Sequence, residues 1–308
     1  MCRILLSLLI AHGIFVSTPL VAQQFPHALH KAVQRRVATL PGAQVALWFE
    51  DLATGDTLGV ADTISFHAAS TMKVPVMIEL FRRVDAGDLD LDDRIVLTNR
   101  FASIVDGSPY TLSPGDDSDG AIYARIGAPI SLRELNERMI VRSSNLAANV
   151  LIGQLDPTRV TASARALGGA GVTVLRGVED GKAYEAGLSN VTTARGLGKL
   201  LAALERGEAA SRWATVAMRS TLLRQEFNDQ IPAGLPPGTP VAHKTGSITA
   251  TLHDAAIVYP PGRAPFVLVI LTRAIPDRAD AQSLTADLAR LVWDYATRTT
   301  AAGASASR

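Results

Sequence analysis

The hydrophobic pattern near the N-terminus predicts a helix followed by a β-hairpin. Apolar residues recur at helical spacing over residues 25–40, and the helix is expected to end before Pro41 and Gly42. Residues 44–51 are rich in Val, Leu, Trp and Phe, as strands usually are. Residues 57–60 follow after a short turn, so we expect two paired strands.

The middle of the chain predicts helices, whereas its C-terminal part returns to strands. Ser131 and Glu134 form a capping-box pattern at the start of one of these helices. The helices are expected over residues 70–87, 131–139, 146–155 and 192–204. After a Pro- and Gly-rich linker, strands are expected at 241–247, 254–259 and 266–272, and a closing helix at 283–295.

These patterns predict an α/β fold with two lobes. Because both ends combine strands with helices, we expect an antiparallel sheet flanked by N- and C-terminal helices, formed by residues 23–66 and 236–300. The helical residues 67–235 would form an inserted all-α lobe, with a site expected between the lobes. Residues 99–126 are polar, Gly-rich and acidic, and are expected to form a loop that borders this site.

Both ends of the chain carry segments that are expected to lie outside this fold. Residues 1–22 combine an early arginine, an apolar run and a Val-Ala pair, which predicts a secretory signal cleaved near Ala22 and a secreted, periplasmic protein. An uncleaved membrane anchor is the alternative, but a histidine, a glycine and a proline interrupt the run, so no stable membrane anchoring is expected. Residues 301–308 are rich in Ala and Ser and are expected to be disordered.

Composition narrows the classes of function. The chain has 308 residues with 30 Lys and Arg against 29 Asp and Glu, and no basic block, so we expect no nucleic-acid partner. The only cysteine, Cys2, lies in the signal segment, which leaves the mature protein without thiol chemistry. The six histidines show no metal-ligand spacing, and neither a metal nor another cofactor is expected. A small-molecule or cell-wall substrate fits this near-neutral chain, with a monomer as the default.

The most informative motif is Ser70 followed three residues later by Lys73. On a helix this spacing places both side chains on one face, about one turn apart, where the amine can meet the hydroxyl. Such a pair can activate a serine as a nucleophile without histidine. A helix-capping serine is the plain alternative, and Ser-x-x-Lys arises by chance about once in a chain of this length. The motif therefore needs partners elsewhere in the sequence.

Two further motifs follow in order, Ser-Ser-Asn at 143–145 and Lys-Thr-Gly at 244–246. With the first motif they resemble the signature of class A β-lactamases and penicillin-binding proteins, and the chain is most similar to a divergent class A β-lactamase. The resemblance covers nearly all of the chain after residue 22 and implies the same two-lobed fold. It implies a site made of Ser70, Lys73 and Ser143 for catalysis and of Asn145, Lys244, Thr245, Gly246 and Ser247 for substrate binding.

The resemblance also assigns a role to each of these groups. Ser70 would carry the acyl intermediate, Lys73 would assist it, and Ser143 would pass a proton to the leaving nitrogen. The backbone N–H groups of Ser70 and Ser247 would form the oxyanion hole. Lys244 would lend positive charge to the carboxylate of the substrate.

A deacylating glutamate separates class A enzymes from penicillin-binding proteins, and its position in the family matches Glu179. Arg176 and Asn190 stand near the positions of the family's loop-closing Arg–Asp pair, and an asparagine there is expected to weaken the closure. Glu185 imitates the family pattern as well, so it remains an alternative, as does the absence of such a carboxylate. Whether Lys73 or Glu179 is the base for acylation is left open.

Two departures from the family pattern are visible. Ser144 replaces the usual aspartate, which removes a carboxylate that normally steadies this turn. The stretches 230–234 and 248–252 lack the arginine that usually binds the substrate carboxylate. Recognition would then rest on the Lys-Thr-Gly strand, assisted by His243 or His253 if either is charged.

The sequence therefore predicts a secreted serine hydrolase that opens β-lactams through acyl-Ser70, with water held by Glu179, and so contributes to antibiotic resistance. A cell-wall D,D-peptidase or an esterase on the same scaffold is the first alternative, motivated by the missing arginine and the altered glutamate loop. A penicillin-acylated binding protein without turnover is the second.

Overall fold

A five-stranded antiparallel sheet forms the frame of the molecule. The structure, a computed structural model, describes residues 21–305, with side chains from 27 to 298. The strands lie in the order β2-β1-β11-β10-β9, and every neighbouring pair is antiparallel. Their bounds are β1 Gln44–Asp51, β2 Thr57–Val60, β9 Val241–Ile248, β10 Thr251–Val258 and β11 Phe266–Arg273.

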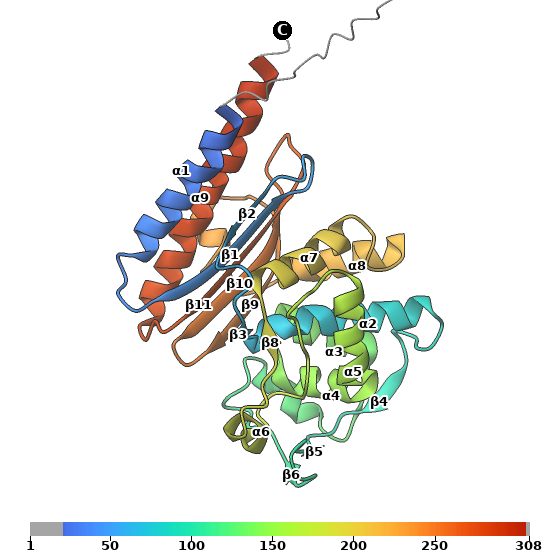
Figure 1. Ribbon diagram of the computed structural model, residues 1–308. Coiled ribbons are helices and arrows are strands. Elements are labelled where there is room, and N and C mark those ends of the chain that lie inside the picture. The colour runs from blue at the N-terminus through green and yellow to red at the C-terminus, as the bar shows by residue number, and fades with distance from the viewer. Residues whose placement is uncertain (1–20, 306–308) are drawn as a thin grey trace, which may run out of the picture.

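The terminal helices cover one face of this sheet. Helix α1 (Val21–Val37) and helix α9 (Arg278–Ser305) lie side by side across it (Figure 1). Successive side chains of a strand point to opposite faces. In β1, accordingly, Leu47 and Phe49 join the core under these two helices, whereas Ala46 and Trp48 join the core shared with the other lobe.

The other face of the sheet meets an all-α lobe, in which α7 packs against β1, β10 and β11 (Figure 1). The helices of this part are α2 Lys73–Asp85, α3 Leu132–Val141, α4 Asn145–Leu155, α5 Pro157–Ala166, α6 Gly181–Glu185, α7 Ala194–Glu205 and α8 Arg212–Leu222, with 3-10 turns η1 Ala69–Met72 and η2 Gly120–Arg125. A third 3-10 turn, η3 Pro232–Gly234, packs against α9 on the opposite face of the sheet. Short two-stranded pairs join β3 Phe66–His67 to β8 Val191–Thr192, β4 Arg94–Val96 to β7 Pro129–Ser131, and β5 Phe101–Ala102 to β6 Pro109–Tyr110. The predicted fold class is confirmed.

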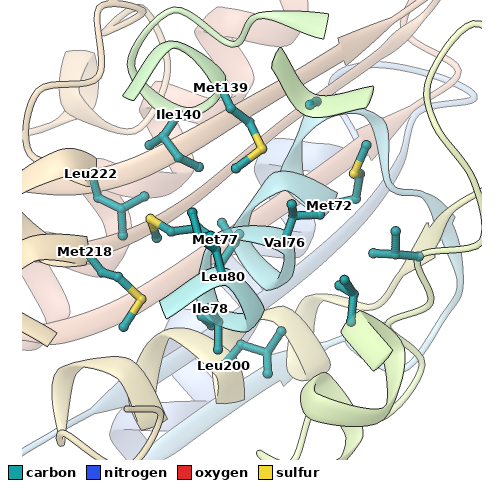
Figure 2. Packing of buried hydrophobic residues seen from close by; sticks show 14 of the residues in the cluster. Met72, Val76, Met77, Ile78, Leu80, Met139, Ile140, Leu200, Met218 and Leu222 are labelled. Carbon is teal, nitrogen blue, oxygen red and sulfur yellow. The ribbon is translucent and has the colours of Figure 1, made fainter. Parts of the chain in front are cut away.

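Helix α2 runs through the centre of the all-α lobe, and its core is unusually rich in methionine. Figure 2 shows Met72, Met77, Met139 and Met218 gathered around α2, and all four are buried. Methionine adapts its shape to irregular gaps, so it fills the space where several helices cross. The branched residues packed with them are Val76, Ile78, Leu80, Ile140, Leu200 and Leu222. The turn η1, directly before α2, packs against β9 and β10, so the start of α2 lies beside the sheet.

Local signals placed most elements within a few residues. The N-cap half of the predicted capping box is present, because the Ser131 hydroxyl accepts a hydrogen bond from the Glu134 N–H at 3.2 Å, whereas the Glu134 carboxylate pairs with Arg125 and Arg138. The α-helix expected to begin at Ser70 instead begins at Lys73, after the 3-10 turn η1.

Helices α5, α6 and α8 were not predicted. The glycines around the five-residue helix α6 obscure its period, and α5 is short, whereas α8 has a clear apolar face that was overlooked, with Ala214, Met218 and Leu222 buried at helical spacing.

Parts of the predicted termini cannot be compared with the structure. Residues 1–20 of the predicted signal segment lie outside the described residues, as do 306–308 of the predicted tail, whose earlier residues overlap the end of α9. Within residues 21–305, no helix combines the length and the apolar character needed to cross a membrane. The exact lobe boundaries stay a prediction.

Candidate active site

Three residues at the meeting point of the two lobes have unusual backbone conformations. Ala69, Ser143 and Glu179 have φ angles of 45°, 58° and 62°, although none of them is glycine. Such conformations cost on the order of 1–3 kcal/mol each and persist only where the surroundings enforce them. They mark three chain segments, before α2, before α4 and before α6, that converge on one point.

Lys73 lies at the centre of the place where these three segments meet. Its amine lies 3.0 Å from Ser70 Oγ, 2.9 Å from Asn145 Oδ1 and 3.2 Å from Ser143 Oγ, and it donates to the Ser143 carbonyl oxygen at 2.6 Å. An ammonium group has three protons for these four oxygens, whereas an uncharged amine has a lone pair that can accept the Ser70 hydroxyl proton. The first two predicted motifs are thus brought together by direct hydrogen bonds.

Burial changes the protonation of this lysine. The Lys73 side chain has no exposed surface, and the loss of hydration lowers its pKa to about 7, although the negative charges of Asp117 and Glu179 raise it. A substantial fraction of the amine is therefore uncharged near neutral pH. Ser70 thus has a potential base within hydrogen-bonding distance.

Strand β9 brings the third motif to the same place. The Lys244 amine donates to Ser143 Oγ at 3.0 Å and to the Thr245 carbonyl oxygen at 2.9 Å. Burial, with the charge of Lys73 nearby, holds the pKa of Lys244 well below its usual range. Gly246 permits this approach, since a Cβ there would lie 3.1 Å from the backbone nitrogen of Ser70.

A cavity of about 670 Å³ opens beside these residues. It is lined by Ser70, Asn145 and Glu179 from the all-α lobe and by Ser247 and Thr249 from the edge of the sheet. This size is ordinary for a small-molecule site. The predicted position of the site between the two lobes agrees with this cavity.

Glu179 faces the cavity, whereas Glu185 does not. Asn145 Nδ2 donates to Glu179 Oε1 at 2.8 Å, and desolvation is the main cause that raises the pKa of the Glu179 carboxyl. Glu185 is exposed at the end of α6 and does not line the cavity. The geometry therefore favours Glu179 over Glu185 as the carboxylate that could hold a water molecule there.

The loop that carries Glu179 is held from behind by asparagines. Asn149 donates to the Val178 carbonyl oxygen at 3.0 Å and accepts from the Val178 N–H at 2.6 Å. The sequence analysis missed this role, although Asn149 lies four residues after Asn145 and hence on the same face of α4. That spacing is the signal that could have found it.

Asn190 and Arg176 close the same loop by hydrogen bonds to the backbone. Asn190 Oδ1 accepts from the N–H groups of Leu175 and Arg176 at 2.7 and 3.1 Å, and its amide donates to the Arg176 carbonyl oxygen at 3.0 Å. Arg176 Nε donates to the Leu188 carbonyl oxygen at 2.7 Å. The closure needs no carboxylate at position 190.

Segment 99–126 borders the site, as expected, and also holds the Glu179 loop. Asp180, directly after Glu179, accepts hydrogen bonds from Ser103 Oγ at 2.8 Å and from the Ile104 N–H at 3.0 Å. Asp180 also caps α6 through the Ala183 N–H at 3.1 Å. The segment therefore fixes the backbone on which Glu179 is presented.

An arginine missed by the sequence analysis lies beside the cavity. Arg278, at the first turn of α9, donates to Ser247 Oγ at 3.0 Å and lies 3.6 Å from Asp229. It follows the Lys-Thr-Gly motif at a distance in sequence that no local pattern could reveal. The positive charge of Arg278 therefore lies beside Ser247, at the edge of the sheet that lines the cavity.

His243 and His253 were expected to assist recognition of the substrate carboxylate if either is charged, but both rings form hydrogen bonds inside the protein. His253 is fully buried between the carbonyl oxygens of His67 and Leu252, and desolvation lowers its pKa to about 4, so it is neutral. The His243 ring is buried against Asp254 and Asn228. That part of the prediction is wrong, because both rings are committed to the interior. In the described part of the chain, no cluster of three or more potential ligands could hold a metal ion.

Known proteins resemble this chain over almost its whole length. The family model "Beta-lactamase enzyme family" matches residues 28–296. The chain is 30% identical over 268 residues to a beta-lactamase of Streptomyces albus G, covering 84% of this chain and 83% of that one. It is also 30% identical over 269 residues to a beta-lactamase of Rhodobacter capsulatus, covering 84% of both.

Solved structures agree with this match. An ancestral class A beta-lactamase superposes with a TM-score of 0.74 at 26% identity, covering 88% of this chain and 99% of that chain. The structure of PBP-A superposes with a TM-score of 0.75 over 88% of this chain and 96% of that chain, and at 24% identity it supports the fold alone. The matched residues span both lobes and every candidate site residue.

Proposed function

The chain belongs to the beta-lactamase enzyme family, and we propose that it opens β-lactam amide bonds by a class A-like mechanism through an acyl-Ser70 intermediate. Beta-lactamase relatives support β-lactam hydrolysis in general. The finer proposal is supported by one continuous set of contacts, in which Ser70 Oγ, Lys73 Nζ, Ser143 Oγ and Lys244 Nζ follow one another at 3.0, 3.2 and 3.0 Å.

In acylation, Ser70 Oγ attacks the carbonyl carbon of the β-lactam while Lys73 takes the hydroxyl proton. The C–N bond of the ring then breaks, and Ser143 gives a proton to the leaving nitrogen and regains one from Lys73. Lys244 lies beside Ser143, and a substrate carboxylate bound there would favour its charged form, so that Lys244 supplies positive charge once substrate is bound. The backbone N–H groups of Ser70 and Ser247 receive the developing oxyanion.

In deacylation, a water molecule positioned by Glu179 and Asn145 adds to the acyl carbon. Glu179 takes one proton of this water, the bond to Ser70 Oγ breaks, and the proton returns to Ser70. The contact between Asn145 and Glu179 at 2.8 Å and the raised pKa of Glu179 support this assignment. A carboxyl with a raised pKa is better matched to proton transfer near neutrality.

The test is turnover of a chromogenic cephalosporin by purified protein, followed by absorbance and by intact mass. Sustained hydrolysis with a transient adduct on the peptide that contains Ser70 is expected. A stable adduct without turnover would instead mean a penicillin-acylated binding protein. Faster cleavage of a D-Ala-D-Ala peptide or a simple ester than of any β-lactam would mean a D,D-peptidase or an esterase.

We also propose that the protein is exported by residues 1–22. Expression of the full chain in a Gram-negative host, followed by cell fractionation and N-terminal sequencing, tests this proposal. Recovery from the periplasm with a new N-terminus near Gln23 is expected. An uncleaved protein in the membrane fraction would contradict it.

The rate of acylation is expected to rise with pH through about 7, since uncharged Lys73 acts as the base and its pKa is lowered to about 7. In the Glu179→Gln variant this rising limb should persist but move to lower pH, because a negative charge that raises the pKa of Lys73 is lost. Single-turnover stopped-flow measurements between about pH 5 and 9 give the profile. Loss of the limb in the variant would assign the base to Glu179.

We propose that Arg278, which lies beside Ser247, binds the substrate carboxylate. Arg278→Ala is then expected to raise KM about 10- to 100-fold with little change in kcat, because a charged hydrogen bond to that carboxylate contributes roughly 1.5–3 kcal/mol. Steady-state kinetics on a penicillin and on the ester of its carboxylate measure this effect, and the ester should show no difference between the variant and the wild type. Arg290→Ala, an exposed arginine on the same helix, is the matched control. An unchanged KM for the free carboxylate would remove Arg278 from substrate binding.

A further inference from the structure

Asp117 is a buried carboxylate that reaches from segment 99–126 to the start of α4. Only 7% of its surface is exposed. Its Oδ2 accepts hydrogen bonds from the backbone N–H groups of Asn145 at 3.0 Å and Leu146 at 2.9 Å. The hydroxyl of Tyr123 donates to the same oxygen at 3.1 Å, and that of Ser144 does so at 3.4 Å.

Asp117 is itself held in place by its neighbours. Its Oδ1 accepts from the Asp119 N–H at 2.9 Å, and Asp119 forms an ion pair with Arg138 of α3 at 2.8 Å. Ser118 Oγ donates to the Arg142 carbonyl oxygen at 2.6 Å. The loop is thus attached to α3 and to the residues directly before the 143–145 turn.

The start of α4 depends on this carboxylate. The first N–H groups of a helix have no partner within the helix. Ser144, the N-cap, satisfies only the Ala147 N–H, at 3.3 Å, whereas Asn145 and Leu146 rely on Asp117. A negative charge at a helix N-terminus is also favourable. The strained Ser143 backbone, with φ of 58°, therefore leads into a helix start held by a side chain from another segment.

The charge of Asp117 also acts on the site. Among the described residues it forms hydrogen bonds only with uncharged groups, and its charge raises the pKa of both Lys73 and Glu179. The other titratable groups that interact with Lys73 or Glu179 are Tyr110, Asp116, Tyr123 and Lys244.

We propose that Asp117 is a positioning residue for acylation, which holds the 143–145 turn and the start of α4 and thereby aims Ser143 and Asn145 at Lys73. Segment 99–126 thus supplies, through Asp117, the carboxylate that position 144 lacks. The inference rests on the proposed β-lactam acylation. It extends that proposal to a residue that never touches the substrate.

The first test is Asp117→Asn, which keeps the shape of the side chain and removes its charge. The acylation rate on a chromogenic cephalosporin should fall about 10- to 100-fold, as expected for reacting groups misplaced by a fraction of an ångström to about 1 Å. The rising limb of the pH profile should move to lower pH, whether Lys73 or Glu179 carries it, because Asp117 raises the pKa of both. Asp92→Asn, an exposed carboxylate paired with Arg133, is the matched control and should change neither property.

The second test adds Ser144→Asp. An aspartate at the N-cap can accept from the second or third N–H of the helix, here Leu146 or Ala147. In the Asp117→Asn background it should recover at least about tenfold of the lost rate, whereas in the wild type it places two carboxylates together and should lower the rate. Ser144→Asp is therefore expected to raise the rate in the Asp117→Asn background and to lower it in the wild type. If position 144 merely tolerates or rejects an aspartate, the effect should have the same direction in both backgrounds.

The outcomes separate this inference from the function on which it rests. No acylation of the wild type would refute the proposed function. An active wild type with an unchanged Asp117→Asn variant, or a slower variant with an unmoved pH limb and no recovery by Ser144→Asp, would refute the positioning role. Thermal unfolding of each variant accompanies the kinetics. If Asp117→Asn does not fold, the folded double variant still tests the role, because its rate must approach that of the wild type.

Discussion

Ser70→Ala is expected to abolish turnover of β-lactams and to leave no covalent adduct. The substitution removes the hydroxyl group that lies 3.0 Å from the Lys73 amine and belongs to a residue lining the cavity. Loss of a nucleophile that works together with its base typically lowers the rate by about 10⁴-fold or more. Steady-state hydrolysis of a chromogenic cephalosporin and intact mass after incubation measure both effects.

The control for this prediction is Ser283→Ala, an exposed serine on α9 that contacts Arg36 of α1 and does not line the cavity. Its activity and mass adduct should match those of the wild type. Ser70→Ala should still fold, because Ser70 contributes no buried apolar surface and the core around α2 is unchanged. A persistent adduct in Ser70→Ala would show that another side chain is acylated.

Glu179→Gln is expected to be acylated but to release product very slowly. Acylation should stay within about tenfold of the wild type, whereas deacylation should fall by about 10²- to 10⁴-fold, the usual contribution of a general base. The physical reason is that glutamine keeps the shape and the contact with Asn145 but cannot take the proton of water. A burst of one equivalent in absorbance, with an adduct that lasts for hours in the mass spectrum, would be the observed result.

Glu185→Gln serves as the matched control, because Glu185 belongs to the same region but is exposed and outside the cavity. It should turn over like the wild type. If Glu185→Gln traps the adduct instead, the two assignments are exchanged. If neither variant changes deacylation, water is positioned by another group, and the role proposed for Glu179 is lost.

Much of the fold follows from local rules. Residues 45–49 and 266–271 are continuous apolar runs, so a strand built from either one has two apolar faces, and the sheet has a hydrophobic core on each side. The spacing of Ser70 and Lys73 requires proximity, and the two groups meet at 3.0 Å. The short helices α5 and α6 were missed because a weak period over five to ten residues is easily overridden by tertiary packing. Helix α8 has a clear helical period that was overlooked.

The sequence by itself determined the fold class, the three ordered motifs and the family, since helical and strand periods and short motif spacings are local properties of the chain. Only the tertiary structure decided which glutamate faces the cavity, that Arg278 stands beside Ser247, and that Asp117 reaches the first turn of α4. These are contacts between segments that lie far apart in the sequence. Which residues meet in such contacts depends on how whole helices and strands pack together, and neither the periodicity nor the motif spacing of the sequence contains that information.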